Sequence, residues 1–362
     1  MNGPKAHDWI NELDVYISGK SETVHAVKSI KLSANESALG PSPMAMAAYV
    51  NEAQKLHRYP DPAYNELRQT IAGRYALDMK RITCGVGSDE ILKLACRAYI
   101  KPGDEAIYVA HSFSMYPIAL KSVGGVAIEV ADENYTANVD NILGAVSDKT
   151  RIIFIANPNN PTGTYLSKAE INRLWTNIPS DVLLVLDAAY AEFVDKDDYD
   201  AGIKLVERSK NVLMTRTFSK LYGIAALRLG WAYACEDISQ TLDKVRDPFN
   251  VPSSAQVAGV AALKDSEFEE KALAYNKQWR EWLSENLTNL GLMVIPSQTN
   301  FILIKFEDNK KSATAANDYL LRHGYILRYY SSGGLEDCLR LTVGLESENK
   351  EIVKLLKAFL GN

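Results

Sequence analysis

Short apolar runs alternate with stretches of helical periodicity from about residue 58 to about residue 251. Six runs have the length and composition of strands, at residues 106–110, 126–130, 151–156, 182–187, 211–215 and 230–234. Helical segments lie between them, among them residues 89–99, residues 167–175 and the stretch after Met115. Several strand runs are apolar throughout, as expected when helices cover both faces of a sheet. The pattern predicts the α/β class, with a doubly wound, mostly parallel sheet.

The last third of the chain has a different pattern. Residues 254–263 predict a helix rich in small residues, and a long polar helix follows through residue 289. Three β-type runs come next, at residues 301–306, 325–330 and 338–343. Residues 348–360 predict a closing helix, because Ile352, Leu355, Leu356 and Phe359 repeat at helical spacing. This order of elements predicts a second, smaller α+β domain.

Composition narrows the classes of function. The 362 residues are 47% hydrophobic and 23% charged, which is ordinary for a globular protein with one large and one smaller domain. The net charge of −5 argues against a general nucleic-acid binder, and no run approaches the roughly 20 apolar residues of a membrane span. Four widely spaced cysteines indicate reduced thiols, and the polar N-terminus does not look like a signal peptide, so we expect a cytoplasmic protein. The five histidines are scattered, so we expect no metal site.

Polar residues follow two neighbouring strands of the predicted sheet. Asp187 ends the apolar run 182–186, and Asn160 lies in the turn 157–163 that follows the strand at 151–156. Taken alone, each is equally consistent with a capping or turn residue. Taken together, they would lie at the carboxyl edge of the sheet, where doubly wound sheets bind ligands. The sequence therefore predicts a binding site at this edge.

The strand at 211–215 brings a third group of side chains to the same edge. Lysine and arginine are usually surface residues, but Lys220 directly precedes, and Arg228 lies within, a stretch at 221–229 that is otherwise uncharged and mostly apolar. Ser219 and Arg228 are suited to hold a phosphate by charge-assisted hydrogen bonds. Lys220 is suited to be the amine of a Schiff base.

Residues 85–90, Gly-Val-Gly-Ser-Asp-Glu, open the helix at 89–99, and free N–H groups at a helix start bind phosphate. The dinucleotide fingerprint lacks its third glycine, because Glu90 stands there, and no Walker lysine follows. The sequence therefore argues against both a dinucleotide-binding and a nucleoside-triphosphate-binding protein. The chain also lacks the G-x-S-x-G motif of serine hydrolases.

These motifs resemble those of the fold-type I pyridoxal-phosphate aminotransferases, and within that class they are most similar to the histidinol-phosphate aminotransferases. The likeness covers nearly the whole chain and includes residues 31–36, 40–43, 58–61, 87–90, 159–163, 187–190, 217–223, 326–330 and 339–344. The resemblance implies a large domain at 46–253 that binds pyridoxal 5'-phosphate. It also implies an N-terminal arm at 1–45, which belongs to the small domain and the substrate site, and a C-terminal small domain at 254–362.

The resemblance further implies roles for individual residues. Lys220 would bind the cofactor covalently, and Asp187 would pair with its ring nitrogen. Tyr190 and Asn160 would hydrogen-bond its phenolic oxygen. The other cofactor contacts would come from Gly87, Ser88, Asp89, Phe113, Thr217, Ser219, Arg228 and, from the neighbouring subunit, Tyr59, which implies a homodimer. The substrate contacts would come from Tyr16, Asn35, Arg328 and Arg340.

The two arginines lie on different predicted strands of the small domain. In residues 325–330, strand alternation puts Arg328 on one face with Ile326 and Tyr330. In residues 338–343, it puts Arg340 on the face opposite to the leucines. Either arginine alone is consistent with an exposed residue. Because arginine binds carboxylate and phosphate bidentately, the pair is suited to a small substrate with acidic groups.

The leading hypothesis is transfer of an amino group from glutamate to imidazole-acetol phosphate, which gives histidinol phosphate. Three alternatives stay open: an aromatic or broad-specificity aminotransferase of the same subgroup, a phosphothreonine decarboxylase-like lyase, and a non-catalytic regulator on the same fold. The chain departs from the family pattern at Leu39, Ala188 and Ala226. These departures leave the choice of substrate open.

Overall fold

A seven-stranded sheet forms the centre of the larger part of the molecule. The structure is a computed structural model and describes residues 3–13, 15, 29–307 and 311–361. The strand order is β2 (Ile82–Gly85), β8 (Gly230–Ala234), β7 (Val212–Thr217), β6 (Leu183–Asp187), β5 (Thr150–Ala156), β3 (Glu105–Val109) and β4 (Val126–Val130). β8 pairs antiparallel with both β2 and β7, and the other four pairings are parallel, so the predicted α/β class with a mostly parallel sheet is confirmed.

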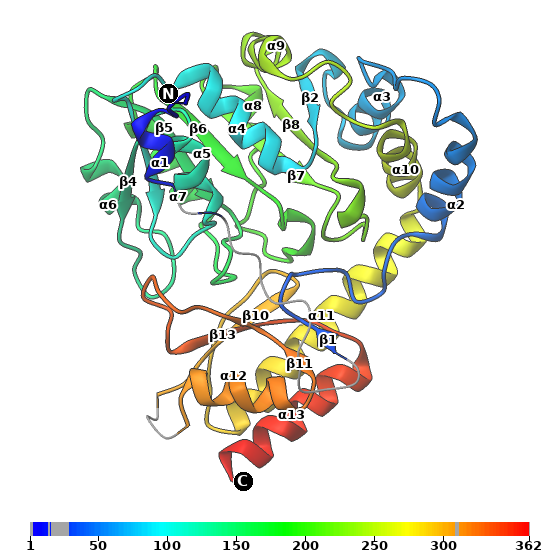
Figure 1. Cartoon of the computed structure of the whole chain (residues 1–362), viewed down its shortest axis with the longest axis vertical. Coiled ribbons are helices and arrows are strands. Elements are labelled where there is room, and N and C mark those ends of the chain that lie inside the picture. The colour runs from blue at the N-terminus through cyan, green and yellow to red at the C-terminus, as the bar shows by residue number, and fades with distance from the viewer. Residues whose placement is uncertain (1–2, 14, 16–28, 308–310, 362) are drawn as a thin grey trace.

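Helices cover both faces of this sheet (Figure 1). One face packs against α4 (Ser88–Tyr99), α5 (Met115–Lys121) and α9 (Glu236–Val245). The other packs against α3 (Asn65–Tyr75), α6 (Val139–Gly144), α7 (Lys168–Asn177), α8 (Ile203–Glu207) and α10 (Ser253–Lys264). Along β6, Leu184 and Leu186 enter one core while Leu183 and Val185 enter the other. This double burial explains why the strand is apolar throughout.

The C-terminal part builds a second, antiparallel sheet with its own core. Its strand order is β12 (Arg328–Tyr329), β13 (Cys338–Thr342), β10 (Phe301–Lys305) and β9 (Met293–Ile295). The helices α11 (Ser266–Asn289), α12 (Ala313–Arg322) and α13 (Glu346–Leu360) contribute to this core. None of the helices in the described part of the chain is long and apolar enough to cross a membrane.

The prediction of one continuous strand over residues 325–330 is wrong. β11 (Tyr325–Ile326) pairs in parallel with β1 (Ile30–Lys31), whereas Arg328 and Tyr329 pair with β13. Leu327, between the two strands, is buried in the second core. The local pattern gave no sign of the break, because the partner of Tyr325 and Ile326 lies some 295 residues earlier in the chain.

Helix α11 links the two cores. Ala272 belongs to the core under the large sheet, whereas Trp279, Leu283 and Leu287 belong to the second core. Figure 1 shows α11 running from the region of α10 and α2 (Pro43–Glu52) toward α12 and α13. Helix α10 packs against α2 and α3. The division at residues 45 and 253 stays a prediction.

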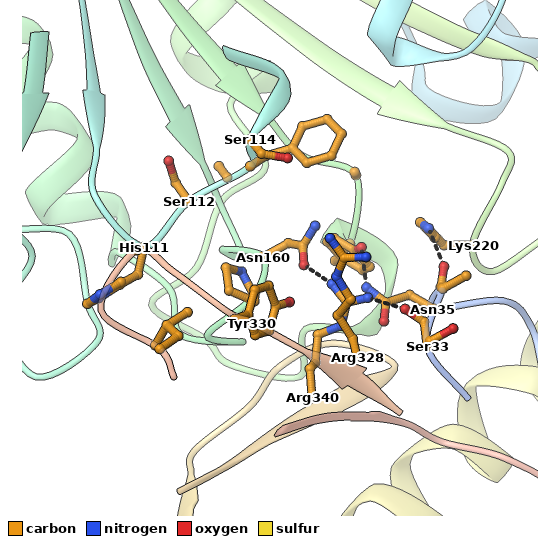
Figure 2. Close-up of a pocket in the computed structure, with 18 of the residues that line it drawn as sticks. Ser33, Asn35, His111, Ser112, Ser114, Asn160, Lys220, Arg328, Tyr330 and Arg340 are labelled. Atoms are coloured by element: carbon orange, nitrogen blue, oxygen red, sulfur yellow. Dashed lines mark hydrogen bonds between the residues drawn. The ribbon is translucent and has the colours of Figure 1, made fainter. Parts of the chain in front are cut away.

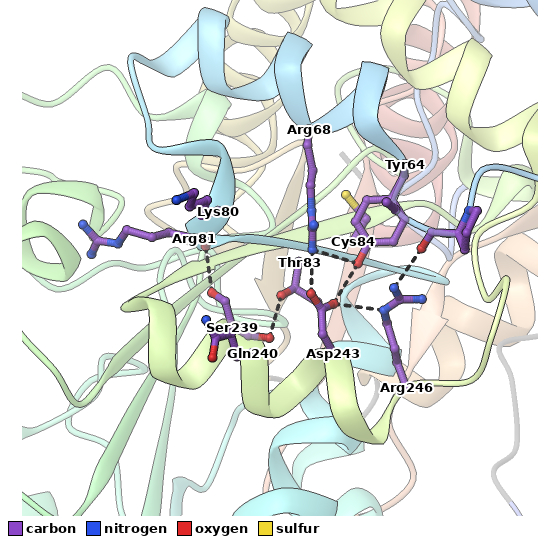
Figure 3. A network of polar contacts seen from close by, with 12 residues as sticks. Tyr64, Arg68, Lys80, Arg81, Thr83, Cys84, Ser239, Gln240, Asp243 and Arg246 are labelled. Carbon is purple, nitrogen blue, oxygen red and sulfur yellow. Dashed lines mark hydrogen bonds and ion pairs between the residues drawn. The ribbon is translucent and has the colours of Figure 1, made fainter.

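A polar network fixes the edge of the large sheet that leads into the site (Figure 3). The carboxylate of Asp243 on α9 accepts hydrogen bonds from Arg68 on α3 at 2.8 Å, from Arg246 at 2.9 Å and from the Tyr64 hydroxyl at 3.1 Å. Both guanidinium groups also lie over the Tyr64 ring. Strand β2 packs between these two helices and continues into the turn before α4, so the network holds the start of α4 in place.

Candidate active site

A cavity of about 890 Å³ lies where the carboxyl ends of the large parallel strands face the second sheet (Figure 2). Residues that follow β3, β5, β6 and β7 line one side of it. Residues 33–36 and the strands β12 and β13 line the other side. Most of the predicted site residues line this cavity: Asn35, Ser88, Asp89, Phe113, Asn160, Asp187, Tyr190, Thr217, Ser219, Lys220, Arg228, Arg328 and Arg340.

Asp187 is a buried carboxylate at the end of β6. It accepts hydrogen bonds from the Tyr116 hydroxyl at 3.0 Å and from Thr215 Oγ1 at 3.1 Å. Burial raises the pKa of Asp187 to about 6, and the two hydrogen bonds oppose this shift. Within the described residues it makes no ion pair. Since buried charges are normally paired, the carboxylate is suited to a cationic group of a ligand.

Lys220 brings an amine to the same cavity. Its Nζ donates to the Ala34 carbonyl at 3.3 Å and lies 5.7 Å from the centre of the Tyr190 ring. Burial, and next the charge of Arg340, lower the pKa of Lys220 to about 8. Arg228 lowers the pKa of Lys220 as well, but less than Arg340 does. The amine is therefore partly neutral near neutral pH, as a nucleophile must be.

Arg340 connects the two sides of the cavity. Its guanidinium donates to Asn160 Oδ1 and to the Ser33 carbonyl, each at 2.5 Å, and lies over the Phe301 ring. Its buried Nε has no hydrogen-bond partner among the residues that the structure describes. Because Asn160 accepts through its oxygen, its NH2 group is the end that remains to donate to a ligand.

Tyr190 is held by a chain of buried amides and hydroxyls. Its hydroxyl accepts from Asn35 Nδ2 at 2.8 Å, and Asn35 in turn accepts from the Thr342 hydroxyl at 3.2 Å. Burial raises the pKa of Tyr190 to about 12, so the phenol stays protonated and can donate. Asn35, expected to contact substrate, lines the cavity, and both ends of its amide serve this chain.

The start of α4 faces the loop after β7. Arg228 donates to Ser219 Oγ at 3.4 Å and to Asp89 at 3.2 Å. A Cβ added to Gly87 would lie 2.7 Å from Arg228 Nη2, and Gly87 has a φ of 79°, so only glycine fits. Thr217 accepts from the Ser219 backbone N–H at 3.1 Å. The free N–H groups of α4, the hydroxyls and the guanidinium together form a site suited to phosphate.

The remaining predicted residues have different surroundings. Phe113 meets the Tyr116 ring edge to face at 5.7 Å. Tyr59 is 83% exposed, away from the cavity, and stacks on Phe249. Arg328 lies over the Tyr330 ring. Tyr16 lies outside the described residues. Leu39, Ala188 and Ala226 do not line the cavity. These departures from the family pattern can therefore change its shape only through neighbouring residues.

Sequence reasoning missed two residues that hold Asp187. Tyr116, the second residue of α5, is fully buried, and Thr215 is buried on β7 beside Asp187. Thr215 was within reach of a prediction, because it directly follows the apolar residues 212–214 of β7. Tyr116 was not, because its contact depends on how α5 lies over the sheet. Among the described residues, no group of three or more His, Cys, Asp or Glu side chains is arranged to hold a metal ion.

A buried ion pair supports the segment that carries Tyr190. Arg216 Nη1 lies 3.1 Å from Glu192 Oε1, and the two side chains are only 9% and 7% exposed. Burial raises the pKa of Glu192. We expect Glu192→Gln to lower the free energy of unfolding by about 3–5 kcal/mol, because it leaves a buried guanidinium unpaired. Urea unfolding measures this.

The double variant Glu192→Leu/Arg216→Met is the matched comparison for that prediction. It removes both charges, so it should be less destabilised than Glu192→Gln. Equal stability of the wild type and Glu192→Gln would contradict a structural role for the pair.

The fold brings a partly buried amine and a buried carboxylate into one cavity at the edge of its large sheet, an arrangement typical of an enzyme active site. Comparison with known proteins gives the family: residues 27–356 match the family described as aminotransferase class I and II. The chain belongs to this family of transaminases, which depend on pyridoxal phosphate.

Two relatives match along essentially the whole chain. The histidinol-phosphate aminotransferase of Paramagnetospirillum magneticum is 48% identical over 362 residues, 100% of each chain. That of Rhodospirillum centenum is 44% identical over 360 residues, 99% of each chain. The crystal structure of histidinol-phosphate aminotransferase from Sinorhizobium meliloti in complex with pyridoxal-5'-phosphate superimposes with a TM-score of 0.93 at 25% identity. It covers 99% of this chain and 98% of that chain.

Proposed function

We propose that the chain is a histidinol-phosphate aminotransferase, which converts histidinol phosphate and 2-oxoglutarate into imidazole-acetol phosphate and glutamate. The observation that carries the proposal is the pair of arginines opposite the amine. Arg328 and Arg340 are direct partners on neighbouring strands, and both line the cavity that contains Lys220. Two guanidinium groups beside one amine suit a substrate with an amino group and an anionic group. The names of the two full-length relatives support the same substrate.

The residues fit pyridoxal phosphate by their chemistry. When bound, this cofactor supplies an electron sink for the negative charge that develops on the substrate carbon bearing the amino group. Asp187 would keep the ring nitrogen protonated, because a buried carboxylate without an ion pair is completed by a cation. Ser88, Ser219 and Arg228 would hold the phosphate at the start of α4.

Lys220 would hold the cofactor covalently and then move a proton. With a pKa lowered to about 8, the released amine can accept the proton from the substrate carbon. Tyr190 would donate its proton to the phenolic oxygen of the ring, because Asn35 already donates to the tyrosine oxygen. Asn160 would donate to the same oxygen through its NH2 group, since Arg340 occupies its Oδ1.

Arg340 and Arg328 would bind different anionic groups of the two substrates. The Nε of Arg340 has no partner among the described residues and is buried beside Asn160 and Ser33. It can therefore donate to a substrate carboxylate close to the amine of Lys220. Arg328 is only partly buried and would take the phosphate of histidinol phosphate. Glutamate would present its side-chain carboxylate to the same arginine. This sharing explains how one site accepts two substrates in turn.

Half-reaction spectroscopy of the holoenzyme tests the substrate. Histidinol phosphate and glutamate should each remove the absorbance band of the lysine-bound cofactor, and phenylalanine should do so much more slowly.

We expect Arg328→Gln to lower kcat/KM for histidinol phosphate about 10–100-fold, because a charge-assisted contact contributes about 1.5–3 kcal/mol. The exposed Arg322→Gln is the matched control. Conversion by phenylalanine but not histidinol phosphate would overturn the substrate and favour an aromatic aminotransferase.

We further propose that the chain works as a homodimer in the cytoplasm. All four cysteines are free, which suits a reducing compartment. Large apolar side chains are exposed along α2 and the segment after it: Met44, Met46, Tyr49, Val50, Leu56 and Tyr59, with Phe249 beside them. An exposed apolar patch of this kind is typical of an interface between subunits. Tyr59 would reach the partner's cofactor from this surface.

The oligomeric state can be tested at the same surface. The wild type should have twice the chain mass of 40.1 kDa by light scattering. Val50→Asp/Leu56→Asp places two charges in the patch and should produce monomers, whereas Met293→Asp, at another exposed apolar position on β9, should not. A monomeric wild type with full activity would contradict the dimer.

A further inference from the structure

His111 lies at the far end of the cavity from the amine. It follows β3 in the loop that leads to Phe113, and it faces the turn 331–334, which joins the two strands that carry Arg328 and Arg340. In Figure 2, His111 and Lys220 occupy opposite ends of the pocket, with both arginines between them. None of the catalytic roles proposed above uses this histidine.

The imidazole is held between the two parts of the molecule. Its Nδ1 lies 2.8 Å from Asp132 Oδ2, and the two side chains are 19% and 12% exposed. The ring also hydrogen-bonds the backbone of Gly333. A Cβ added to Gly334 would lie 2.7 Å from His111 Nε2, so the turn touches the ring directly. The backbone of His111 is fixed as well, because its carbonyl accepts from Asn159 at 2.6 Å.

The charges around the imidazole favour its protonated form. Asp132 lies after β4 and Glu129 lies on β4, while the Tyr135 ring is 6.1 Å away. From the small part of the molecule, the turn presents the Gly333 backbone. The hydrogen bond with Asp132 is the main cause that raises the pKa of His111. Protonated, the ring donates from both nitrogens, to a carboxylate and to a carbonyl. Neutral, it donates from only one.

We propose that His111 is a positioning residue that clamps the turn 331–334 to the large sheet and thereby holds Arg328 in place for the phosphate of the substrate. The inference rests on the proposed role of Arg328. Only two residues separate Arg328 from the start of the turn, and Arg340 lies six residues after Gly334. The turn therefore sets the spacing of the two guanidinium groups. The raised pKa means that the clamp is complete below the usual histidine value of about 6.5. It weakens as pH rises through the pKa of the folded protein.

The first test needs no substrate. Hydrogen–deuterium exchange of the holoenzyme at about pH 6.5 should be faster in residues 328–338 of His111→Gln and Asp132→Asn than in the wild type. Glutamine keeps one polar end but cannot carry the charge. His323→Gln removes an exposed histidine from the end of α12 and should leave exchange in this segment unchanged. Equal exchange in the wild type and His111→Gln would overturn the clamp, whatever the substrate is.

The second test separates positioning from general damage. At about pH 6.5, His111→Gln should raise the KM for histidinol phosphate about tenfold and change kcat less than twofold. The ratio of the KM of the variant to that of the wild type should fall toward one as pH rises through the pKa of the wild-type imidazole. In an Arg328→Gln background, His111→Gln should have no further effect on KM.

The outcomes distinguish this inference from the proposed function. An equal rise in KM in both backgrounds, or a rise that persists at high pH, would show that His111 does not act through Arg328 in its charged form. A wild type that ignores histidinol phosphate would overturn the substrate. In that case the exchange experiment still decides the clamp, and the double-variant comparison is made with glutamate.

Discussion

Replacing Lys220 with alanine should abolish turnover and the visible absorbance of the lysine-bound cofactor, while leaving a folded protein. The variant would remove both the proposed covalent attachment and the group proposed to move the proton. Loss of the proton transfer alone costs about 10²–10⁴-fold in rate. Removing a half-buried amine whose pKa is lowered to about 8 should not destabilise the fold, because burial already disfavours its charge.

Lys220→Arg is the matched variant for this result. It keeps a positive charge between Arg340 and Asp89 but has no amine that can be neutral near pH 8. We therefore expect it to be as inactive as Lys220→Ala. Steady-state turnover, the visible spectrum and circular dichroism report on activity, attachment and fold separately. Substantial turnover by either variant would remove Lys220 from the centre of the mechanism.

The second large effect is expected at Asp187. Asp187→Asn keeps the shape of the side chain but removes the charge that would hold a proton on the ring nitrogen. Preorganised electrostatic groups of this kind are worth about 10²–10³-fold in kcat. Thr215→Val, which removes one of the two hydrogen bonds to the carboxylate and leaves its charge, should cost much less. If Asp187→Asn and Thr215→Val lose activity equally, the charge is not what matters.

The same carboxylate should leave a signature in the stability of the cofactor-free protein. Burial raises its pKa from 3.8 to about 6, so between these values the folded state binds more protons than the unfolded state. Stability should therefore fall as pH rises from about 4 to about 6. The loss should reach about 3 kcal/mol, at 1.36 kcal/mol per pKa unit. Asp187→Asn should lack this component in urea unfolding followed across that range, and adding pyridoxal phosphate should restore stability in the wild type.

The strand that ends in Asp187 could be predicted for a simple physical reason. β6 lies in the middle of the large sheet with helices on both faces, so every side chain before Asp187 must be apolar. A carboxylate directly after such a run stands out. The same reasoning applies to Lys220, whose loop follows the buried strand β7.

Contacts between distant segments could not be predicted in this way. The residues that connect Asn35 to Tyr190 and Thr342 are far apart in the chain, and no local periodicity relates them. The break after Ile326 has the same origin, because it depends on pairing with β1. The largest charge effect on the pKa of Lys220 has the same origin. Arg228 is near in sequence, whereas Arg340 is near in space.

Borohydride treatment of the holoenzyme, followed by peptide mass spectrometry, tests the central claim most directly. Reduction converts a carbon–nitrogen double bond between a lysine and an aldehyde into a stable amine, and so marks the lysine that carries the cofactor. We expect a single modified peptide, with the pyridoxyl group on Lys220. A colourless protein without any modified peptide, or a modification on another lysine, would contradict it.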